Sequence, residues 1–235
     1  MPPTVSIVIP TFNEESELPE LFTMIKRQTL QPVEVIVADA HSTDKTREMA
    51  MAFGARVVEG GLPAVGRNRG AALATGDWLL FLDADAKLPD HAFLERAIGE
   101  IKRRNLDIAC PNIQTTYGVM AGLFFSVYNT YGHLLRHLHP HAVGSCIFVR
   151  RELHQKIHGF DETIKFAEDN DYGVRAGKVG RFGYLHELIK TPPRRFERDG
   201  YLRSAVVHIL SGFHVLFLGP IRSDIFRYRF GHKKK

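Results

Sequence analysis

The sequence predicts an α/β fold in which one domain holds a mostly parallel central sheet with helices on both faces. Three observations predict it. Apolar runs of strand length recur along the chain without polar alternation, as expected for strands buried on both faces. Helical patterns separate these runs, and a β-α-β order implies parallel strands. The length of 235 residues suffices for one large α/β domain and is short for two.

The first strand is expected from Val5 to Ile9, where Pro10 ends it. A polar turn, Thr11 to Glu15, follows it. Ser16 is a candidate N-cap for an amphipathic helix. Apolar residues of this helix recur with the spacing i, i+3, i+4, i+7, and they are Leu18, Leu21, Phe22 and Ile25.

The second strand is expected from Val33 to Ala38, followed by a second polar turn that begins at Asp39. Ser42 or Thr43 is expected to cap a helix that extends through Phe53. A short third strand covers residues 56–59. The β-α-β-α-β order supports the parallel sheet.

A glycine-rich stretch, Gly60 to Gly70, is expected to be a loop that enters a helix. It lacks the G-x-G-x-x-G spacing of dinucleotide-binding loops and does not follow the first strand, so that function is rejected. Arg67 and Arg69 face either phosphates or solvent, and the sequence leaves both options open.

The run Trp78 to Leu82 is the most apolar strand candidate, and two carboxylates, Asp83 and Asp85, stand where this strand should end. Ligands of open α/β sheets bind outside the carboxyl ends of the strands. Carboxylate oxygens suit Mg²⁺ or Mn²⁺, which in turn can hold a diphosphate. The alternative is a pair of aspartates that only form a turn.

Four further elements are expected: a helix over 89–104, a strand over 106–116, a helix over 117–135 and a strand over 145–149. The helix over 117–135 contains no Asp, Glu, Lys or Arg and has a wide apolar face. Its glycines and polar residues make it a poor membrane span. Packing in the core, lining an acceptor site and lying on a membrane surface all remain open for it.

Three carboxylates, Glu168, Asp169 and Asp171, are expected in the first turn of another helix. The helix dipole favours negative charge there, so capping alone would explain them. The functional alternative is a general base held near the metal site.

Charge is unevenly distributed along the chain. Residues 190–235 carry eleven Lys and Arg against three Asp and Glu, which leaves a net charge of −3 for residues 1–189 out of +5 overall. An apolar stretch of about 15 residues inside this basic region is too short to span a bilayer. We expect residues 201–235 to form an amphipathic basic tail that contacts an anionic membrane surface. The alternative is a helix packed on the body with a frayed end.

Two other class assignments follow from composition. The basic residues are not interleaved with a nucleic-acid reading module, so no nucleic-acid partner is expected. Cys110 and Cys146 have no metal-ligand spacing and are expected to be reduced core residues. The first residues run directly into the strand expected at Val5, so no signal peptide is expected. We therefore expect a cytoplasmic protein, peripheral on the cytoplasmic face of the membrane if the tail binds lipid.

Several stretches together resemble the inverting glycosyltransferases of family 2, which have the GT-A fold. They occur in the order of that family and cover about three quarters of the chain. The matching stretches are SIVIPTFNEE (6–15), VIVADAHSTDKT (35–46), GRNRGAALATGDWLLFLDADA (66–86), SCIFVRREL (145–153) with GFDE (159–162), and EDNDYGVRA (168–176). The resemblance implies that residues 1–200 form a GT-A catalytic domain.

The resemblance also implies roles for individual residues. Asp169, in the Glu168-Asp169 pair, would be the catalytic base. Asp83 and Asp85 would bind the metal, with Asp85 the better candidate for direct ligation. Residues expected at the nucleotide-sugar donor are Thr11, Asn13, Glu14, Glu15, Asp39, Arg67, Asp83, Glu168, Arg194 and Arg195, of which Arg194 and Arg195 would meet the diphosphate. Ala40 stands where family members often carry a second aspartate, so the choice of base stays open.

The chemistry of such a transfer fits these residue types. One carboxylate must take a proton from the attacking hydroxyl. A divalent ion, Mn²⁺ or Mg²⁺, stabilises charge on the departing nucleoside diphosphate. The expected partners are a UDP- or GDP-sugar and a hydroxyl acceptor, for which the apolar helix and basic tail favour a lipid-linked or membrane-proximal molecule.

Two rival functions remain at this point. A nucleotidyltransferase on a related fold should carry a glycine-rich loop with arginine and lysine after the first strand, where this chain has TFNEE. A non-catalytic nucleotide-sugar binder or membrane-docked scaffold would not need Asp39, Asp83, Asp85 and Asp169 together.

Overall fold

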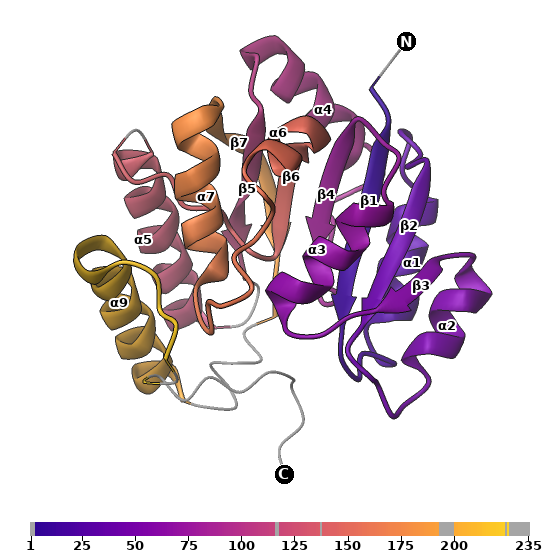
Figure 1. Cartoon of the computed structure of the whole chain (residues 1–235), viewed down its shortest axis with the longest axis horizontal. Coiled ribbons are helices and arrows are strands. Elements are labelled where there is room, and N and C mark those ends of the chain that lie inside the picture. The colour runs from indigo at the N-terminus through magenta and orange to yellow at the C-terminus, as the bar shows by residue number, and fades with distance from the viewer. Residues whose placement is uncertain (1–2, 116–117, 137, 193–199, 224, 226–235) are drawn as a thin grey trace.

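The computed structural model describes residues 3–115, 118–136, 138–192, 200–223 and 225. Within these residues, seven strands form one sheet in the order β3-β2-β1-β4-β6-β5-β7 (Figure 1). β6 runs antiparallel to both its neighbours, while the remaining neighbouring pairs are parallel. The strands are β1 (Val5–Thr11), β2 (Glu34–Asp39), β3 (Arg56–Glu59), β4 (Trp78–Leu82), β5 (Ile108–Gln114), β6 (Cys146–Arg150) and β7 (Phe182–Lys190).

Helices cover both faces of this sheet (Figure 1). They are α1 (Leu18–Lys26), α2 (Thr46–Phe53), α3 (Pro63–Leu73), α4 (Phe93–Arg104), α5 (Val119–Leu135), α6 (Arg151–Lys156), α7 (Glu168–Val179) and α9 (Tyr201–Leu218). The predicted α/β class with a mostly parallel sheet is therefore confirmed.

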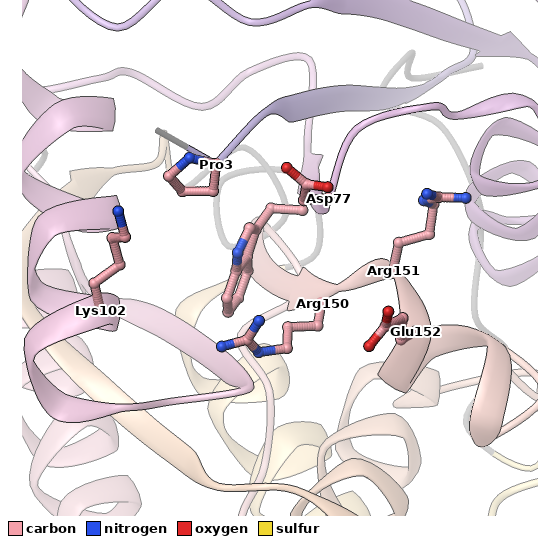
Figure 2. A pocket seen from close by; sticks show the side chains of 7 residues that line it. Pro3, Asp77, Lys102, Arg150, Arg151 and Glu152 are labelled. Carbon is pink, nitrogen blue, oxygen red and sulfur yellow. The ribbon is translucent and has the colours of Figure 1, made fainter. Parts of the chain in front are cut away.

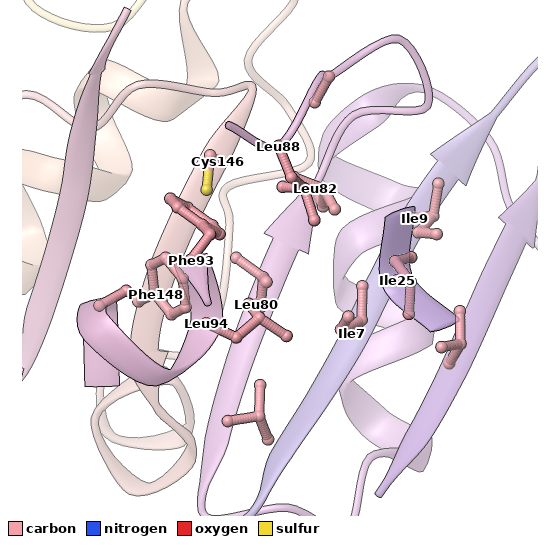
Figure 3. Close-up of a cluster of buried hydrophobic side chains, with 14 of the residues drawn as sticks. Ile7, Ile9, Ile25, Leu80, Leu82, Leu88, Phe93, Leu94, Cys146 and Phe148 are labelled. Atoms are coloured by element: carbon pink, nitrogen blue, oxygen red, sulfur yellow. The ribbon is translucent and has the colours of Figure 1, made fainter. Parts of the chain in front are cut away.

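Alternate side chains of each central strand pack into two hydrophobic cores, one on each face of the sheet. Ile7 and Leu80 point to the face covered by α1 and α4, where Ile25, Phe93 and Leu94 also pack (Figure 3). Val8 and Phe81 belong to the opposite core, under α3, α6 and α7. Burial on both faces explains why these strands read as continuous apolar runs.

The sequence did not predict β7. Its residues FGYLHELIK mix apolar with polar side chains, and their burial alternates toward the end of the strand. β7 is the edge strand of the sheet beside β5, and its second half from His186 to Lys190 is buried only at Ile189. An edge strand needs no continuous apolar run, so the pattern that found the central strands missed this one.

The starts of three helices differ from the prediction. α1 begins at Leu18 after Glu17, and Ser16 does not cap it. α2 begins at Thr46, whose backbone N–H donates to Asp44 Oδ1 at 3.0 Å, so Ser42 and Thr43 lie outside the helix. Helix α4 starts at Phe93, four residues after the predicted start, because residues 90–92 form a turn in which the Ala92 N–H donates to Asp90 Oδ1 at 2.8 Å.

Helix α5 is anchored to the sheet by a polar residue. The side-chain amide of Asn129 accepts from the Ile113 N–H at 3.0 Å and donates to the Ile113 carbonyl at 2.8 Å. This pairing extends the β5 backbone ladder into the helix and fixes which face of α5 is buried.

Among the described residues, no helix is long and apolar enough to cross a membrane. Both cysteines are buried and unpaired, as predicted.

Candidate active site

The candidate site lies at the carboxyl edge of the parallel strands. Thr11 and Asp39 end β1 and β2 side by side in the sheet register. Asp83 follows β4, and its backbone N–H donates to the Ser145 carbonyl at 3.0 Å. Because β6 runs in the opposite direction, its first residues meet the ends of the parallel strands at this edge.

Asp39 is buried and fully engaged in hydrogen bonds. Its Oδ1 accepts from Thr11 Oγ1 at 3.2 Å, and its Oδ2 accepts from the Ser42 N–H at 3.0 Å. Arg47 also pairs with Oδ2 at 3.2 Å, a contact that the sequence did not predict. Neighbouring strands, a turn and α2 thus hold this carboxylate in one orientation.

The two polar turns at this edge are joined to each other. Asn13 adopts a left-handed backbone (φ 56°), its N–H donates to Ser42 Oγ at 2.8 Å and its Oδ1 accepts from the Thr43 N–H at 2.9 Å. Ser42 and Thr43, predicted as helix caps, therefore hold the first turn instead.

Two glutamates continue this junction between the turns. The N–H of buried Glu14 donates to Thr46 Oγ1 at 2.8 Å. Glu15 Oε2 accepts from the Lys45 N–H at 3.1 Å. The predicted donor residues Thr11, Asn13, Glu14, Glu15 and Asp39 therefore form one connected cluster.

Arg67 connects the end of β4 with the start of α7. Its side chain is 4% exposed, and its terminal nitrogens donate to Asp83 Oδ1 at 3.1 Å and to Glu168 Oε1 at 2.8 Å. A third bond reaches the Gly144 carbonyl at 3.0 Å, while the buried Nε has no hydrogen-bond partner among the described residues. Burial alone would lower the pKa of Arg67, but Asp83 and Glu168 raise it above its usual value.

Helix α3 carries Arg67 close to the sheet because of a glycine one turn later. A Cβ on Gly70 would come within 2.3 Å of Val8 Cγ1, so any larger residue would push α3 away from β1. Arg69, on the same helix, donates instead to the Gly60 carbonyl at 2.8 Å. Of the two arginines in this glycine-rich stretch, Arg67 is therefore the one that pairs with Asp83.

Asp169 lies in the first turn of α7 and is held by backbone amides. Its Oδ2 accepts from the Gly144 N–H at 2.9 Å, and its Oδ1 accepts from the Asn170 N–H at 2.9 Å. Burial raises the pKa of Asp169 to about 6, with Glu168 adding to the shift and Arg67 opposing it. Asp169 can therefore exchange a proton near neutral pH.

Asp83 has a similarly shifted acidity. Burial of its carboxyl group raises its pKa to about 6, against the effect of Arg67 and together with that of Asp85. Its side chain nevertheless keeps 36% of its accessible surface, so a ligand can reach its oxygens from solvent.

Gly144 was not predicted from the sequence, yet it joins the charged groups. Its N–H binds Asp169 and its carbonyl binds Arg67. A Cβ at this position would lie 2.7 Å from Asp169 Oδ2. Only the apolar context AVGS before β6 marks it in the sequence, and that context carries no chemical signal.

The residues present suit a divalent cation that is shared with a ligand. Asp83 and Asp85 offer hard carboxylate oxygens, and they lie near enough for the charge of Asp85 to raise the pKa of Asp83. In the described ranges, no group of three His, Cys, Asp or Glu residues gathers to hold a metal by itself. Such a two-carboxylate arrangement is typical of Mg²⁺ or Mn²⁺ that completes its shell with phosphate oxygens and water. Arg194 and Arg195, also predicted at the diphosphate, lie outside the described residues.

A cavity of about 330 Å³ lies at the other end of the strands, away from the carboxyl ends of the parallel ones (Figure 2). It lies near Trp78, where β4 begins, and Arg150, where β6 ends. The Arg150 guanidinium covers the Trp78 ring at 5.1 Å and donates to Asp107 at 2.9 Å. The cavity is therefore separate from the site formed by Asp83 and Asp169.

Solved structures share this fold, and one of them is named as a mannosyltransferase. Mannosyltransferase PcManGT from Pyrobaculum calidifontis, in complex with GDP-Man and Mn²⁺, superposes with a TM-score of 0.71 at 20% identity, over 88% of this chain and 61% of that chain. TarS 1–349 of S. aureus gives a TM-score of 0.65 at 20% identity, over 88% of this chain and 65% of that chain. The chain thus spans less than two thirds of either solved protein.

Sequence comparison gives the same class. The PGL/p-HBAD biosynthesis glycosyltransferase of Mycobacterium bovis is 32% identical over 186 residues, which are 74% of this chain and 69% of that protein. The fold and these relatives together define a GT-A glycosyltransferase that uses nucleotide sugars. The model of glycosyl transferase family 2 matches residues 6–158, and the chain belongs to that family.

Proposed function

We propose that this protein is a metal-dependent inverting glycosyltransferase that moves a sugar from a nucleoside-diphosphate sugar to a hydroxyl acceptor. The observation that carries the proposal is the link made by Arg67 between Asp83, beside the metal pair, and Glu168, beside the base candidate. One buried guanidinium thus brings the leaving-group side and the acceptor side of the reaction together. These are the two places where an inverting transfer needs charge.

The donor is proposed to bind over the cluster formed by the two polar turns. Thr11, Asn13, Glu14 and Glu15 would line it, and Asp39 would contact the base or ribose. TarS has been solved with UDP-GlcNAc and PcManGT with GDP-Man, and both structures share this fold. A UDP- or GDP-sugar is therefore the proposed donor, with the diphosphate near Arg67 and the Asp83-Asp85 pair.

Asp169 is proposed as the catalytic base. Its raised pKa suits a group that must take a proton from a hydroxyl. A carboxylate with a much lower pKa would be a weaker base and would accelerate the reaction less. The Gly144 and Asn170 N–H groups hold its two oxygens in place without neutralising the carboxylate. Glu168 is proposed to keep Arg67 in position.

Asp85, with Asp83, is proposed to hold Mn²⁺ or Mg²⁺. A bound divalent ion would act as a Lewis acid toward the departing diphosphate. The role of this chain's own residues is to present carboxylate oxygens from the turn directly after the fully buried strand β4. The Ala86 N–H donates to the Asp83 carbonyl at 3.1 Å and closes this turn.

Donor binding is tested by thermal stabilisation of the full chain with UDP-, GDP-, dTDP- and CDP-sugars, each with Mn²⁺, with Mg²⁺ and with chelator. One nucleotide should raise Tm, and only with metal. At 100 times Kd the gain is about 2.7 kcal/mol, which for a chain of this size is about 5–11 °C. The absence of any shift from folded protein would contradict the proposed donor site.

Replacing Gly144 by alanine is expected to lower kcat by about 10- to 100-fold. The new Cβ would force Asp169 Oδ2 away from its present position, because the two atoms would otherwise be 2.7 Å apart. Steady-state kinetics at saturating donor measures this effect. Gly122→Ala on α5 is the matched control, since its Cβ would meet no described atom within 4 Å. Equal kcat for both variants would contradict the positioning by Gly144.

We also propose peripheral contact with an anionic membrane and, with it, a lipid-linked or membrane-proximal acceptor. Helix α5 exposes a row of apolar side chains at helical spacing, formed by Leu123, Val127, Tyr131 and Leu134. α9 exposes Val206, Leu210 and Leu218. Both helices lie at the end of the molecule away from β3 (Figure 1). The basic excess of residues 190–235 complements anionic lipid.

Flotation with vesicles that contain phosphatidylserine tests this contact. The full chain should float with them at low salt and less well at high salt, because screening weakens charge attraction. Charge reversal of Lys233, Lys234 and Lys235 to Glu should reduce flotation, and so should Leu134→Ser on α5. Flotation that neither change affects would rule out the proposed contact surface.

A further inference from the structure

The chain returns to the main body after α9, beside the approach to Glu168. Gly219 (φ 85°) ends the helix, and His214 Nδ1 hydrogen-bonds its carbonyl at 3.1 Å. Ile221 then forms an antiparallel bridge with Phe166, in which the Lys165 N–H donates to the Ile221 carbonyl at 2.9 Å. We call residues 219–222 the return segment. Its Ile221 is 1% exposed, so this contact is part of the packed structure.

Arg222 fastens the return segment to the same loop a second time. Its Nε donates to Thr163 Oγ1 at 3.0 Å, and a terminal nitrogen donates to Asp161 Oδ2 at 2.8 Å. The other oxygen of Asp161 accepts from the Thr163 N–H at 2.9 Å and from its hydroxyl at 2.6 Å. The three side chains therefore close a ring of hydrogen bonds that fixes the backbone from 161 to 163.

The beginning of this loop is held by other elements. The Asn68 amide on α3 donates to the Phe160 carbonyl at 2.9 Å and accepts from the Phe160 N–H at 2.8 Å. Arg175 on α7 donates to the Gly159 carbonyl at 2.8 Å. Asn68 reaches two residues further, to Glu162 Oε1 at 2.9 Å. The return segment is bonded to Asp161, Thr163, Lys165 and Phe166, so it holds most of the portion that leads to α7.

A strained residue connects this portion to the site. Ala167 adopts a left-handed backbone (φ 61°), a conformation that is unfavourable for a residue other than glycine. A residue keeps such an unfavourable backbone conformation only when the structure around it holds it there. The next two residues are Glu168, bonded to Arg67, and Asp169, bonded to the Gly144 N–H. The bridge at Phe166 is the last fixed point before this turn of the chain.

We propose that Arg222 is a positioning residue for the catalytic pair, acting through Asp161 and the bridge between Ile221 and Phe166. The C-terminal return segment thereby sets the direction in which the chain enters α7. This role rests on the proposed function of Asp169 as the base. Arg222 and Asp161 are 56% and 27% exposed, and exposed ion pairs contribute little to overall stability. Loss of the pair should therefore affect geometry more than folding.

The test compares Arg222→Ala with Arg203→Ala, a matched change of an exposed arginine at the start of α9. Hydrogen exchange of the amides of residues 163–170 should be about 5-fold faster in Arg222→Ala alone. In the same variant kcat should fall by about 5- to 10-fold, with the KM for donor unchanged and Tm nearly constant. Arg222→Lys should restore part of kcat, since it keeps a charge opposite Asp161.

The two measurements separate this proposal from the proposed function. Hydrogen exchange needs no substrate, so unchanged exchange in Arg222→Ala overturns the holding role whatever the protein's activity. Faster exchange with wild-type kcat overturns the positioning of Asp169. A wild-type protein without transfer to any acceptor would contradict the proposed function, and the exchange result would still decide whether the return segment holds the loop.

Discussion

Asp169→Asn is expected to lower kcat by about 100- to 10,000-fold, the range that a general base contributes. The amide oxygen can still accept the Gly144 N–H bond, but an amide cannot take a proton from the acceptor hydroxyl. Donor binding should remain, because hydrogen bonds between the two polar turns hold the donor cluster at Thr11 and Asp39, while Asp169 is held by Gly144. The variant should therefore still show the donor-dependent rise in Tm.

Asp171→Asn is the control for this change. Asp171 lies in the same first turn, but its carboxylate is paired with Arg175 at 2.7 Å. This variant should keep kcat within a few-fold of wild type. If Asp169→Asn turned over as fast as Asp171→Asn, the base would have to be another group.

The pH profile provides an independent check on Asp169. Its pKa is raised to about 6, so kcat should fall as the pH drops through 6 and the carboxylate becomes protonated. The folded protein binds this proton more tightly than the unfolded chain, whose reference pKa is 3.8. The contribution of Asp169 to stability therefore decreases as pH rises from about 4 to about 6. Activity and this part of the stability respond to pH in opposite directions.

Asp85→Asn is expected to remove most of the metal-dependent donor stabilisation. Even changes behind a metal ligand weaken metal binding by about 10- to 100-fold, and loss of a ligand oxygen should do at least as much. A 100-fold loss corresponds to about 2.7 kcal/mol of donor-linked stabilisation. The Tm of the variant with donor and Mn²⁺ should approach that of wild type with chelator.

Asp90→Asn serves as the control for Asp85→Asn. Asp90 is an exposed aspartate paired with Arg96, away from Asp83, and its replacement should leave the donor-dependent shift intact. A full donor shift in Asp85→Asn would assign the metal to Asp83 alone or remove the metal from the proposal. Titration with Mn²⁺ in the presence of donor distinguishes these two results, because the first still saturates.

Sequence patterns predicted the parts of this protein whose signals are local. The apolar runs of β1, β2 and β4 identified the central sheet, and polar residues directly after them marked its carboxyl edge. Asp83 and Asp169 were selected as candidates from their residue type and from the resemblance to the family, and their roles stay predictions. Asp83 follows strand β4, whereas Asp169 lies in the first turn of α7.

The features that the sequence did not reveal act through the backbone or across long separations. Gly144 contributes only its N–H and carbonyl, and a glycine before a strand indicates no particular chemistry. Arg47 pairs with Asp39 and Arg222 pairs with Asp161 only in the folded chain. No sequence pattern around either arginine predicts its partner. β7 packs as an edge strand, so it lacks the apolar run that a central position would require.

Gly144 also has a mechanical consequence. Its two peptide groups hold the Asp169 carboxylate and the Arg67 guanidinium, and these belong to different helices. The spacing of the two charges is thus tied to the bond lengths and angles of one amino acid. If α3 moves relative to α7, a hydrogen bond to Gly144 must bend or break before the two charges separate. The Asp169 carboxylate and the Arg67 guanidinium can therefore keep their relative positions while the surrounding helices fluctuate.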